Sequence, residues 1–495
     1  MRSNTTRLLV RNVSHLGMGQ IASTILGILL SAVIGRALEP AQLGILYTVF
    51  AISSFAYVIV DWGQGTYLVR EMARGRTDEP ELIGSALLIR LAAVVLLSAV
   101  GVAIAAPLGY SGQIVVLVLL AMMSGIPATL FAPFACSFRS RDRMDVDAFV
   151  SIIGKAITLV ATAIALRFGG GLTEVILMQA IGGVSTLLAG AIAALRLDIK
   201  VAAPVMKLLR ELLRHGSPLA TFSLVIASQP FIEIIMLSAW AGAAVVGWYG
   251  ASTNILGIVM SPAMILLVAT FPALSRAARS LPDLRRMIDA TGRVMFIAAA
   301  FTSSALYLFA DHMVAIIYGH GRFVVTASIL RVSAIFVPLL FLVLVLASAM
   351  NAVGRNKAMA VISIVRIVVC VIFNWLLIGY WQQRFGNGAI VLVIIAGLTE
   401  IPATIACWAL LPKGAVGSAV SLNVLRACVA SLCTVVPLSM LQPLGLLYLI
   451  PLFALLFAVT AMVTRLVLPS DLRLAMEMVR SRVLAPLARR SAPDG

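Results

Sequence analysis

Long apolar runs recur from one end of this 495-residue sequence to the other, and they restrict the fold more than any other feature. A helix needs about 20 consecutive apolar residues to cross the hydrocarbon core of a bilayer. The runs reach that length and do not alternate with period two, which favours helices over a transmembrane β-barrel. The chain is 12% charged, whereas an ordinary soluble domain is about 25% charged. The sequence therefore predicts an all-α polytopic membrane protein.

Fourteen windows of about this length qualify as membrane spans. Their approximate limits are 14–36, 41–64, 82–107, 113–136, 146–167, 173–195, 215–241, 243–273, 291–311, 324–350, 357–380, 388–411, 420–441 and 444–467. Because fourteen is even, both termini are expected on the same side of the membrane. The segment 469–495 follows the last span and places Leu472, Met476 and Val479 on one helical face, so it is expected to lie on the membrane surface.

The basic residues predict which side is cytoplasmic. Of the 37 Lys and Arg residues, 28 lie in the two termini and the even-numbered loops, 4 in the odd-numbered loops and 5 within spans. By the positive-inside rule, the termini and the even-numbered loops face the cytoplasm. The formal charge of +17 then faces anionic lipids of the inner leaflet, which are the expected partners in place of a nucleic acid.

Neither the cysteines nor the loops suggest a cofactor or a catalytic domain. The five cysteines lie in apolar runs, and no CxxC or Cys/His cluster occurs, so no metal, cofactor or disulfide is predicted. The external loops are a few residues each. A membrane glycan polymerase or ligase would need a larger external loop for its catalytic residues, so an enzyme is the less favoured class.

Two segments of the sequence share the same order of features. Gly44 is followed by Tyr47 and Gly247 by Tyr249; each pair opens a long span that ends in a basic patch. The glycines are 203 residues apart, and this offset relates spans 1–6 to spans 7–12 in the same orientation. Parallel repeats of this kind build alternating-access transporters. The predicted parts are an N-terminal lobe (1–200), a C-terminal lobe (201–415), spans 13 and 14 (416–468) and a cytoplasmic amphipathic tail (469–495).

Short motifs in the first two spans resemble those of a known family. They are Leu38-Glu39-Pro40, Gly44 followed by Tyr47, Asp61-Trp62-Gly63 and Val69-Arg70-Glu71-Met72-Ala73-Arg74, with VVGWYGAST and FPALSRAAR in the second half. In these motifs the sequence is similar to the polysaccharide-transporter oligosaccharide flippases, a family of the multidrug/oligosaccharidyl-lipid/polysaccharide (MOP) exporter superfamily. The resemblance covers spans 1–12. It implies two six-helix lobes in a MATE-like V, to which the two C-terminal helices would be an addition.

The resemblance also implies a function. An undecaprenyl-diphosphate-linked oligosaccharide would be exported across a bacterial inner membrane for surface polysaccharide such as O-antigen, capsule or exopolysaccharide. Partners would include a glycan polymerase and chain-length machinery. Two alternatives from the same superfamily stay open: a multidrug/cation antiporter and a flippase for a lipid-linked peptidoglycan precursor. A cation antiporter is expected to have an acidic cavity, whereas Lys and Arg outnumber carboxylates within the predicted spans.

Charged residues within spans are the candidate site residues, because a diphosphate that crosses hydrocarbon needs cations around it. The candidate cations are Lys155, Arg366, Arg90 and Arg331. Lys155 shares a helical face with Ser151, Thr158 and Thr162, a polar stripe typical of a cavity wall. The alternative for each cation, and the favoured one for Arg331, is that the side chain extends to the headgroups.

Two carboxylates are candidates for coupling or charge balance. Glu233 lies roughly 12 Å inside the outer end of span 7, one turn after Gln229, and Glu400 lies in the middle of span 12. Each could carry a coupling proton or neutralise a cavity cation, and a structural ion pair between helices is the alternative. A proton gradient, a sodium gradient and the membrane potential are the candidate energy sources. The residues expected to line the cavity are Gln20, Thr24, Gln229 and Asn374, although close helix packing explains the first two equally well.

Overall fold

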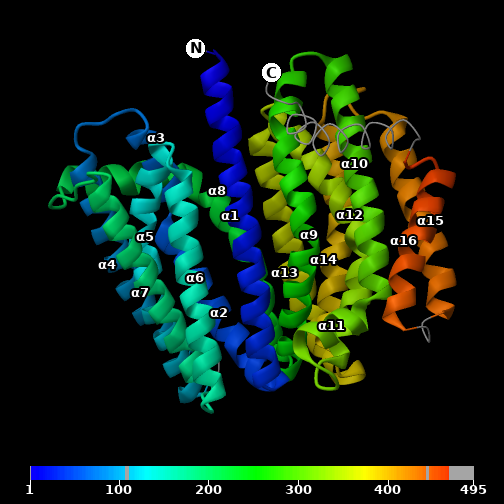
Figure 1. Ribbon diagram of the computed structural model, residues 1–495, viewed down its shortest axis with the longest axis horizontal. Coiled ribbons are helices and arrows are strands. Elements are labelled where there is room, and N and C mark those ends of the chain that lie inside the picture. The colour runs from blue at the N-terminus through cyan, green and yellow to red at the C-terminus, as the bar shows by residue number, and fades with distance from the viewer. Residues whose placement is uncertain (1, 106–110, 442–444, 468–495) are drawn as a thin grey trace, which may run out of the picture. The chain divides into compact units, whose positions relative to one another are not determined.

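The computed structural model describes residues 2–105, 111–441 and 445–467, and every regular element within them is a helix (Figure 1). The helices are α1 (Arg2–Ala37), α2 (Pro40–Asp61), α3 (Gln64–Met72), α4 (Glu79–Ala105), α5 (Gly112–Ser140), α6 (Met144–Arg167), α7 (Leu172–Arg196), α8 (Met206–Trp240), α9 (Ala243–Ala277), α10 (Leu281–Leu308), α11 (Ala310–Tyr318), α12 (Val324–Ala352), α13 (Asn356–Phe385), α14 (Gly388–Leu410), α15 (Ser418–Met440) and α16 (Leu446–Val463).

Each predicted span coincides with one long helix. Twelve helices are long and apolar enough to cross a membrane, and the described part of α1 adds a shorter apolar helix, Ile21–Ala37. The chain is therefore a multi-pass membrane protein, and its fold class is all-α, as predicted. The count of fourteen spans stays a prediction. The predicted amphipathic tail, 469–495, lies outside the described residues.

The chain packs as two compact units. Unit 1 comprises Met1–Ile258, Asp311–Ile329 and Ser363–Ala396, and unit 2 comprises the remaining described residues. These borders run through helices, since unit 1 includes the first turns of α9 and most of α13. The predicted lobe limits at residues 200 and 415 group consecutive membrane spans, whereas the units are defined by packing. The lobe limits therefore stay predictions.

Helices α5, α6 and α7 pack side by side in unit 1 (Figure 1), and α1 lies against α6. Two glycines allow α6 and α7 to approach closely. A Cβ on Gly154 would overlap the hydroxyl of Thr186, and a Cβ on Gly182 would overlap the hydroxyl of Thr158. Small residues commonly bring membrane helices together in this way. The result is that two threonine hydroxyls lie in the α6–α7 interface, and that of Thr158 is one turn from Lys155 on α6.

The crossing of α2 and α9 within unit 1 supports the predicted repeat. A Cβ on Gly44 would overlap the carbonyl oxygen of Ala243, and a Cβ on Gly247 would overlap the carbonyl oxygen of Pro40. Each carbonyl lies four residues before a glycine, so both contacts are related by the same offset of 203. The two backbones therefore touch reciprocally, as expected beside an axis that relates two halves of a parallel repeat.

The Asp61-Trp62-Gly63 motif ends α2. Trp62 has φ 41° and Gly63 has φ 72°, both in the left-handed region, and the chain turns there into α3. Glycine adopts this backbone freely, whereas a residue with a side chain loses about 1–2 kcal/mol. The motif thus corresponds to a helix break, and the basic patch that follows begins with Arg70 in the last turn of α3.

Arg76 joins α4 and α8 beyond the end of α3. Its guanidinium donates to Asp78 Oδ2 at 2.8 Å and pairs with the carboxylate of Glu211 on α8. The hydroxyl of Tyr67 donates to the same Glu211 carboxylate, to Oε1 at 2.5 Å. These bonds fix the start of α8 against the α3–α4 segment, on the side that the charge distribution predicts to be cytoplasmic.

Acidification is expected to weaken this ion cluster. Hydrogen bonds from Arg76 hold the pKa of Asp78 and the pKa of Glu211 below their usual range. Such carboxylates add stability above their unfolded pKa of about 4, and the contribution is lost as the pH falls through the lowered folded pKa. The melting temperature of the purified protein should therefore fall below about pH 4. Arg76→Gln should lower the melting temperature at pH 7 and flatten that fall; an equally steep fall in the variant would rule the cluster out as the cause.

Candidate functional site

Polar side chains from three helices meet inside unit 1. Gln229 and Glu233 come from α8, Tyr249 from α9 and Arg366 from α13. Gln229 Nε2 donates to Glu233 Oε1 at 2.9 Å, and the Tyr249 hydroxyl donates to Glu233 Oε2 at 2.9 Å. Arg366 Nη2 donates to Gln229 Oε1. Gln229 thus bridges the guanidinium of Arg366 and the carboxylate of Glu233, and we call these four residues the α8–α9–α13 network.

The network lies beside an apolar core. Glu233 is 9% exposed, and Tyr249 belongs to a cluster of buried side chains that includes Met236, Leu237 and Cys370. A buried carboxylate is strongly destabilising unless donors and a cation compensate it. Here two donors hold the two oxygens of Glu233, and Arg366 is linked through one amide. The structure therefore brings together three residues that the sequence singled out, and adds Tyr249.

Removing the tyrosine hydroxyl tests the network. Tyr249→Phe keeps the packed ring and leaves Oε2 of the buried Glu233 without its donor, which should cost about 1.5–3 kcal/mol. The melting temperature should therefore fall in Tyr249→Phe. Tyr380→Phe, at a 59% exposed position on α13, should leave it unchanged. Equal melting temperatures for the two variants would mean that the hydrogen bond does not hold Glu233.

Lys155 borders a cavity of about 550 Å³ within unit 1. Helices α2, α5, α6 and α7 form its walls. The uncharged polar side chains that line it are Ser53, Ser54, Tyr57, Ser124, Ser151, Thr158, Gln179 and Thr186. The lining contains no carboxylate. We call this space the Lys155 cavity.

The ammonium of Lys155 has no counter-ion among the residues that the structure describes. Its Nζ donates to the hydroxyl of Ser23 on α1. The predicted polar stripe is present in part: Ser151 and Thr158 line the cavity with Lys155, whereas Thr162, two turns on from Lys155, is fully buried. Ser23 was not anticipated, because nothing local in the sequence relates it to a residue 132 positions away.

Arg90 lies in a different environment. Its side chain is 3% exposed, and Nη2 donates to Asp61 Oδ1 at 2.5 Å. The pair joins α4 to the last residue of α2, directly before the helix break. Arg90 is therefore held by an ion pair with a half-exposed carboxylate, a role that neither the cavity prediction nor the headgroup alternative included.

The remaining candidates are neither members of the network as defined above nor residues that line the Lys155 cavity. Arg331 is half-buried on α12, and Glu400 is 7% exposed on α14; both belong to unit 2. Asn374 is 1% exposed on α13, and its Oδ1 has no partner among the described residues. Thr24 is half-buried on α1, beside Ser23, and the side chain of Gln20 lies outside the described part of the structure. No group of described His, Cys, Asp and Glu residues could hold a metal ion.

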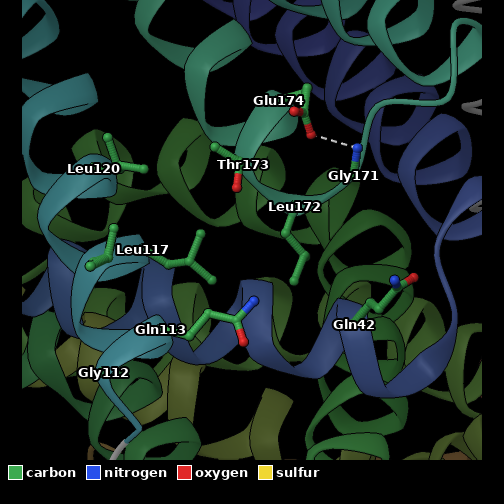
Figure 2. A pocket seen from close by; sticks show the side chains of 10 residues that line it. Gln42, Gly112, Gln113, Leu117, Leu120, Gly171, Leu172, Thr173 and Glu174 are labelled. Atoms are coloured by element: carbon green, nitrogen blue, oxygen red, sulfur yellow. Dashed lines mark hydrogen bonds between the residues drawn. The ribbon is translucent and has the colours of Figure 1, made fainter.

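A second hollow in unit 1, of about 520 Å³, lies at the first turns of α2, α5 and α7 (Figure 2). Gln113 and Gln42 lie on opposite sides with Leu172 between them, as Figure 2 shows. The carboxylate of Glu174 turns to the backbone N–H of Gly171 at 2.6 Å and caps its own helix. The hollow contains no cation, so it does not suit an anionic group.

The comparison with protein families decides the family. The family described as "Polysaccharide biosynthesis protein" matches residues 9–278, more than half of the chain. The chain belongs to this family. Its matched region includes the α2–α9 crossing, the Lys155 cavity and the α8 and α9 residues of the network. No curated protein matches the sequence significantly.

Solved structures share the fold of this chain. A structure titled lipid II flippase MurJ, in an inward closed conformation, superposes with a TM-score of 0.71 at 11% identity, over 90% of this chain and 97% of that one. An inward-facing MATE-family multidrug resistance transporter of the MOP superfamily gives 0.60 at 16% identity, over 79% and 96%. A MOP-superfamily transporter from Pyrococcus furiosus, titled as having a binding pocket of reverse polarity, gives 0.57 at 16%, over 81% and 94%. The chain therefore has the MOP-superfamily fold, as predicted.

Proposed function

We propose that this protein is a flippase that moves an undecaprenyl-diphosphate-linked oligosaccharide across the bacterial inner membrane by alternating access. The oligosaccharide would serve surface polysaccharide such as O-antigen, capsule or exopolysaccharide. The observation that carries the proposal is Lys155, a cation within a membrane span that borders a hydroxyl-lined cavity without a carboxylate. An anionic, polyhydroxylated substrate supplies what this cavity lacks, namely a counter-charge and many hydrogen-bonding groups.

Arg366 is the second cation of the proposed site. In the resting network its guanidinium is bound to the neutral oxygen of Gln229. A phosphate oxygen is a stronger acceptor than an amide, because charge-assisted hydrogen bonds are shorter and roughly twice as strong. The diphosphate would therefore displace Gln229 from Arg366. Arg90 takes no part in this step, because it is already paired with Asp61. Arg331, half-buried on α12, stays a further candidate cation.

Glu233 would couple transport to an energy source. When Gln229 leaves Arg366, the amide that bridges Glu233 to its cation is lost, and the buried carboxylate becomes more costly as an anion. Uptake of a proton or a sodium ion would relieve that cost, and the membrane potential is the third candidate source. Glu400, buried in unit 2, is the second acidic residue proposed for charge balance.

The other transporters of the superfamily predict a different site chemistry. An antiporter for organic cations would place carboxylates around its substrate, and the lining of the Lys155 cavity has a lysine instead. A peptidoglycan-precursor flippase shares the diphosphate logic and has a fold relative here, but the family match favours polysaccharide. Catalysis is not part of the proposal. The proposal also includes cytoplasmic termini, contacts with anionic inner-leaflet lipids, and cooperation with a glycan polymerase and chain-length machinery.

Purified protein in liposomes tests the function directly. Three substrates are supplied in parallel: an undecaprenyl-diphosphate oligosaccharide, a lipid-linked peptidoglycan precursor and a monovalent organic cation. We expect the oligosaccharide lipid to cross at least ten times faster than in protein-free liposomes, and faster than the other two. Preferred movement of the peptidoglycan precursor or of the cation would replace the proposal with the corresponding alternative.

A further inference from the structure

Three arginines line a hollow of about 450 Å³ in unit 2. Arg293 comes from α10, Arg426 from α15, and Arg465 follows the end of α16. Helix α15 packs against both α10 and α16, so the three side chains reach one space from three neighbouring elements. Asp289 and Asn423 complete its polar lining. We call this space the arginine hollow.

Local bonds hold the arginine hollow in shape. Arg293 Nε donates to the backbone carbonyl of Leu466 at 3.2 Å, which ties α10 to the segment after α16. Arg426 Nη1 donates to Asn423 Oδ1 at 3.3 Å, one turn away on α15, and Asn423 is 6% exposed. Arg465 has a left-handed backbone, with φ 58°. The cations are therefore positioned by the helix ends around the hollow.

The side chains that line the hollow carry a net positive charge. The three guanidinium groups and the one carboxylate, that of Asp289, give a formal charge of +2. Neither Arg426 nor Arg465 forms an ion pair with any residue that the structure describes. Oδ1 of Asp289 is buried and has no hydrogen-bond partner among the described residues. A ligand that fits would carry two negative charges and one donor, such as a hydroxyl.

We propose that the arginine hollow binds the headgroup of a phospholipid with two phosphates joined by a hydroxyl-bearing linker, the diphosphatidylglycerol (cardiolipin) class. The two phosphates would face Arg293, Arg426 and Arg465, and the linker hydroxyl would donate to Asp289. Basic pockets between membrane helices on the cytoplasmic side are known to suit such headgroups. Arginine suits phosphate in particular, because its planar fork binds two oxygens at once.

The location of the hollow favours a bilayer lipid over a soluble anion. Asp289 and Arg293 lie two to three turns into α10, and Asn423 and Arg426 about two turns into α15. The charge distribution predicts that these helix ends, and the end of α16, are cytoplasmic. The site therefore lies at the predicted depth of the inner-leaflet headgroups. The hollow shares no lining residue with the Lys155 cavity, and its proposed ligand does not depend on the substrate proposed for transport.

Native mass spectrometry of the full-length protein in detergent tests the proposal. Four probes are compared: cardiolipin, phosphatidylglycerol, undecaprenyl diphosphate and inorganic phosphate. We expect cardiolipin to bind most tightly, and its Kd to rise at least tenfold in Arg426→Ala/Arg465→Ala. The matched control is Arg279→Ala/Arg286→Ala, which removes the same charge from exposed positions in the same unit. Its cardiolipin Kd should equal that of the wild type.

A second variant separates binding from folding. Arg426→Gln/Arg465→Gln keeps polar side chains of similar reach and should also lose cardiolipin at least tenfold, with an unchanged melting temperature in lipid-free detergent. Three results would overturn the proposal: cardiolipin bound equally by the wild type and the Gln variant, an equal loss in the control, or tighter binding of phosphate or undecaprenyl diphosphate than of cardiolipin. Tighter binding of inorganic phosphate would assign the hollow to a free anion. Tighter binding of undecaprenyl diphosphate would assign it to the transported lipid.

Discussion

Cells that carry only Lys155→Ala/Arg366→Ala should lose surface glycan while the variant protein stays in the membrane. Lys155 borders a cavity without a carboxylate, and Arg366 donates to the neutral amide of Gln229. A hydrogen bond to a charged group contributes about 1.5–3 kcal/mol, which corresponds to roughly 10- to 100-fold for each cation. Their joint loss should therefore reduce surface glycan at least 100-fold. Labelled surface polysaccharide and membrane abundance of the protein are the measurements.

Two exposed basic residues on α13, the helix of Arg366, provide a control for the loss of positive charge alone. Lys357 lies in the first turn of α13 and Arg384 in its last, and both are exposed. Lys357→Ala/Arg384→Ala removes one lysine and one arginine, as the test variant does, and should leave surface glycan at the wild-type level. Normal glycan in Lys155→Ala/Arg366→Ala would refute the cation assignment.

A substitution at Glu233 distinguishes a folding defect from a transport defect. Loss of Arg366 leaves the buried carboxylate of Glu233 without the cation that Gln229 links to it. If Arg366→Ala lowers the abundance of the protein for that reason, adding Glu233→Gln should restore abundance, because the buried charge is removed. Surface glycan should remain absent in this double variant. Restored glycan would show that Arg366 serves only to balance Glu233.

Local spacing explains which site residues the sequence could predict. Gln229 and Glu233 are four residues apart on α8, and Ser151, Lys155 and Thr158 are one turn apart on α6, so helical geometry alone places each set on one face. Their partners could not be found in this way. Tyr249 and Ser23 reach the site only through the packing of α9 and α1, and the sequence presented Tyr249 as part of a repeat.

The arginine hollow illustrates a second limit. In the sequence, Arg293, Arg426 and Arg465 are basic residues near the ends of three predicted spans, 291–311, 420–441 and 444–467. The positive-inside rule uses such residues only to assign a side of the membrane. The rule does not indicate whether the three arginine side chains converge on one space. The packing of α15 against α10 and α16 supplies that information.

Addition of one methyl group at the α2–α9 crossing should be strongly destabilising. A Cβ on Gly247 meets the backbone carbonyl of Pro40, and a backbone cannot rotate away as a side chain can. Gly247→Ala should therefore cost more than the roughly 1–3 kcal/mol typical of an overpacked core. Gly257→Ala is the matched control, since its Cβ would meet open space on the same helix. Thermal unfolding in detergent measures both, and similar melting temperatures would mean that the crossing is loose.

The double variant tests whether the two glycines form one contact. Gly44→Ala alone forces α2 away from the carbonyl of Ala243, and Gly247→Ala alone forces α9 away from that of Pro40. Either change separates the same two backbones, so the second methyl group enters space that the first has already opened. Residues in contact typically show interaction energies of about 0.5–3 kcal/mol. Gly44→Ala/Gly247→Ala should therefore lower the melting temperature by clearly less than the sum of the single variants, whereas an additive loss would place the two glycines in independent contacts.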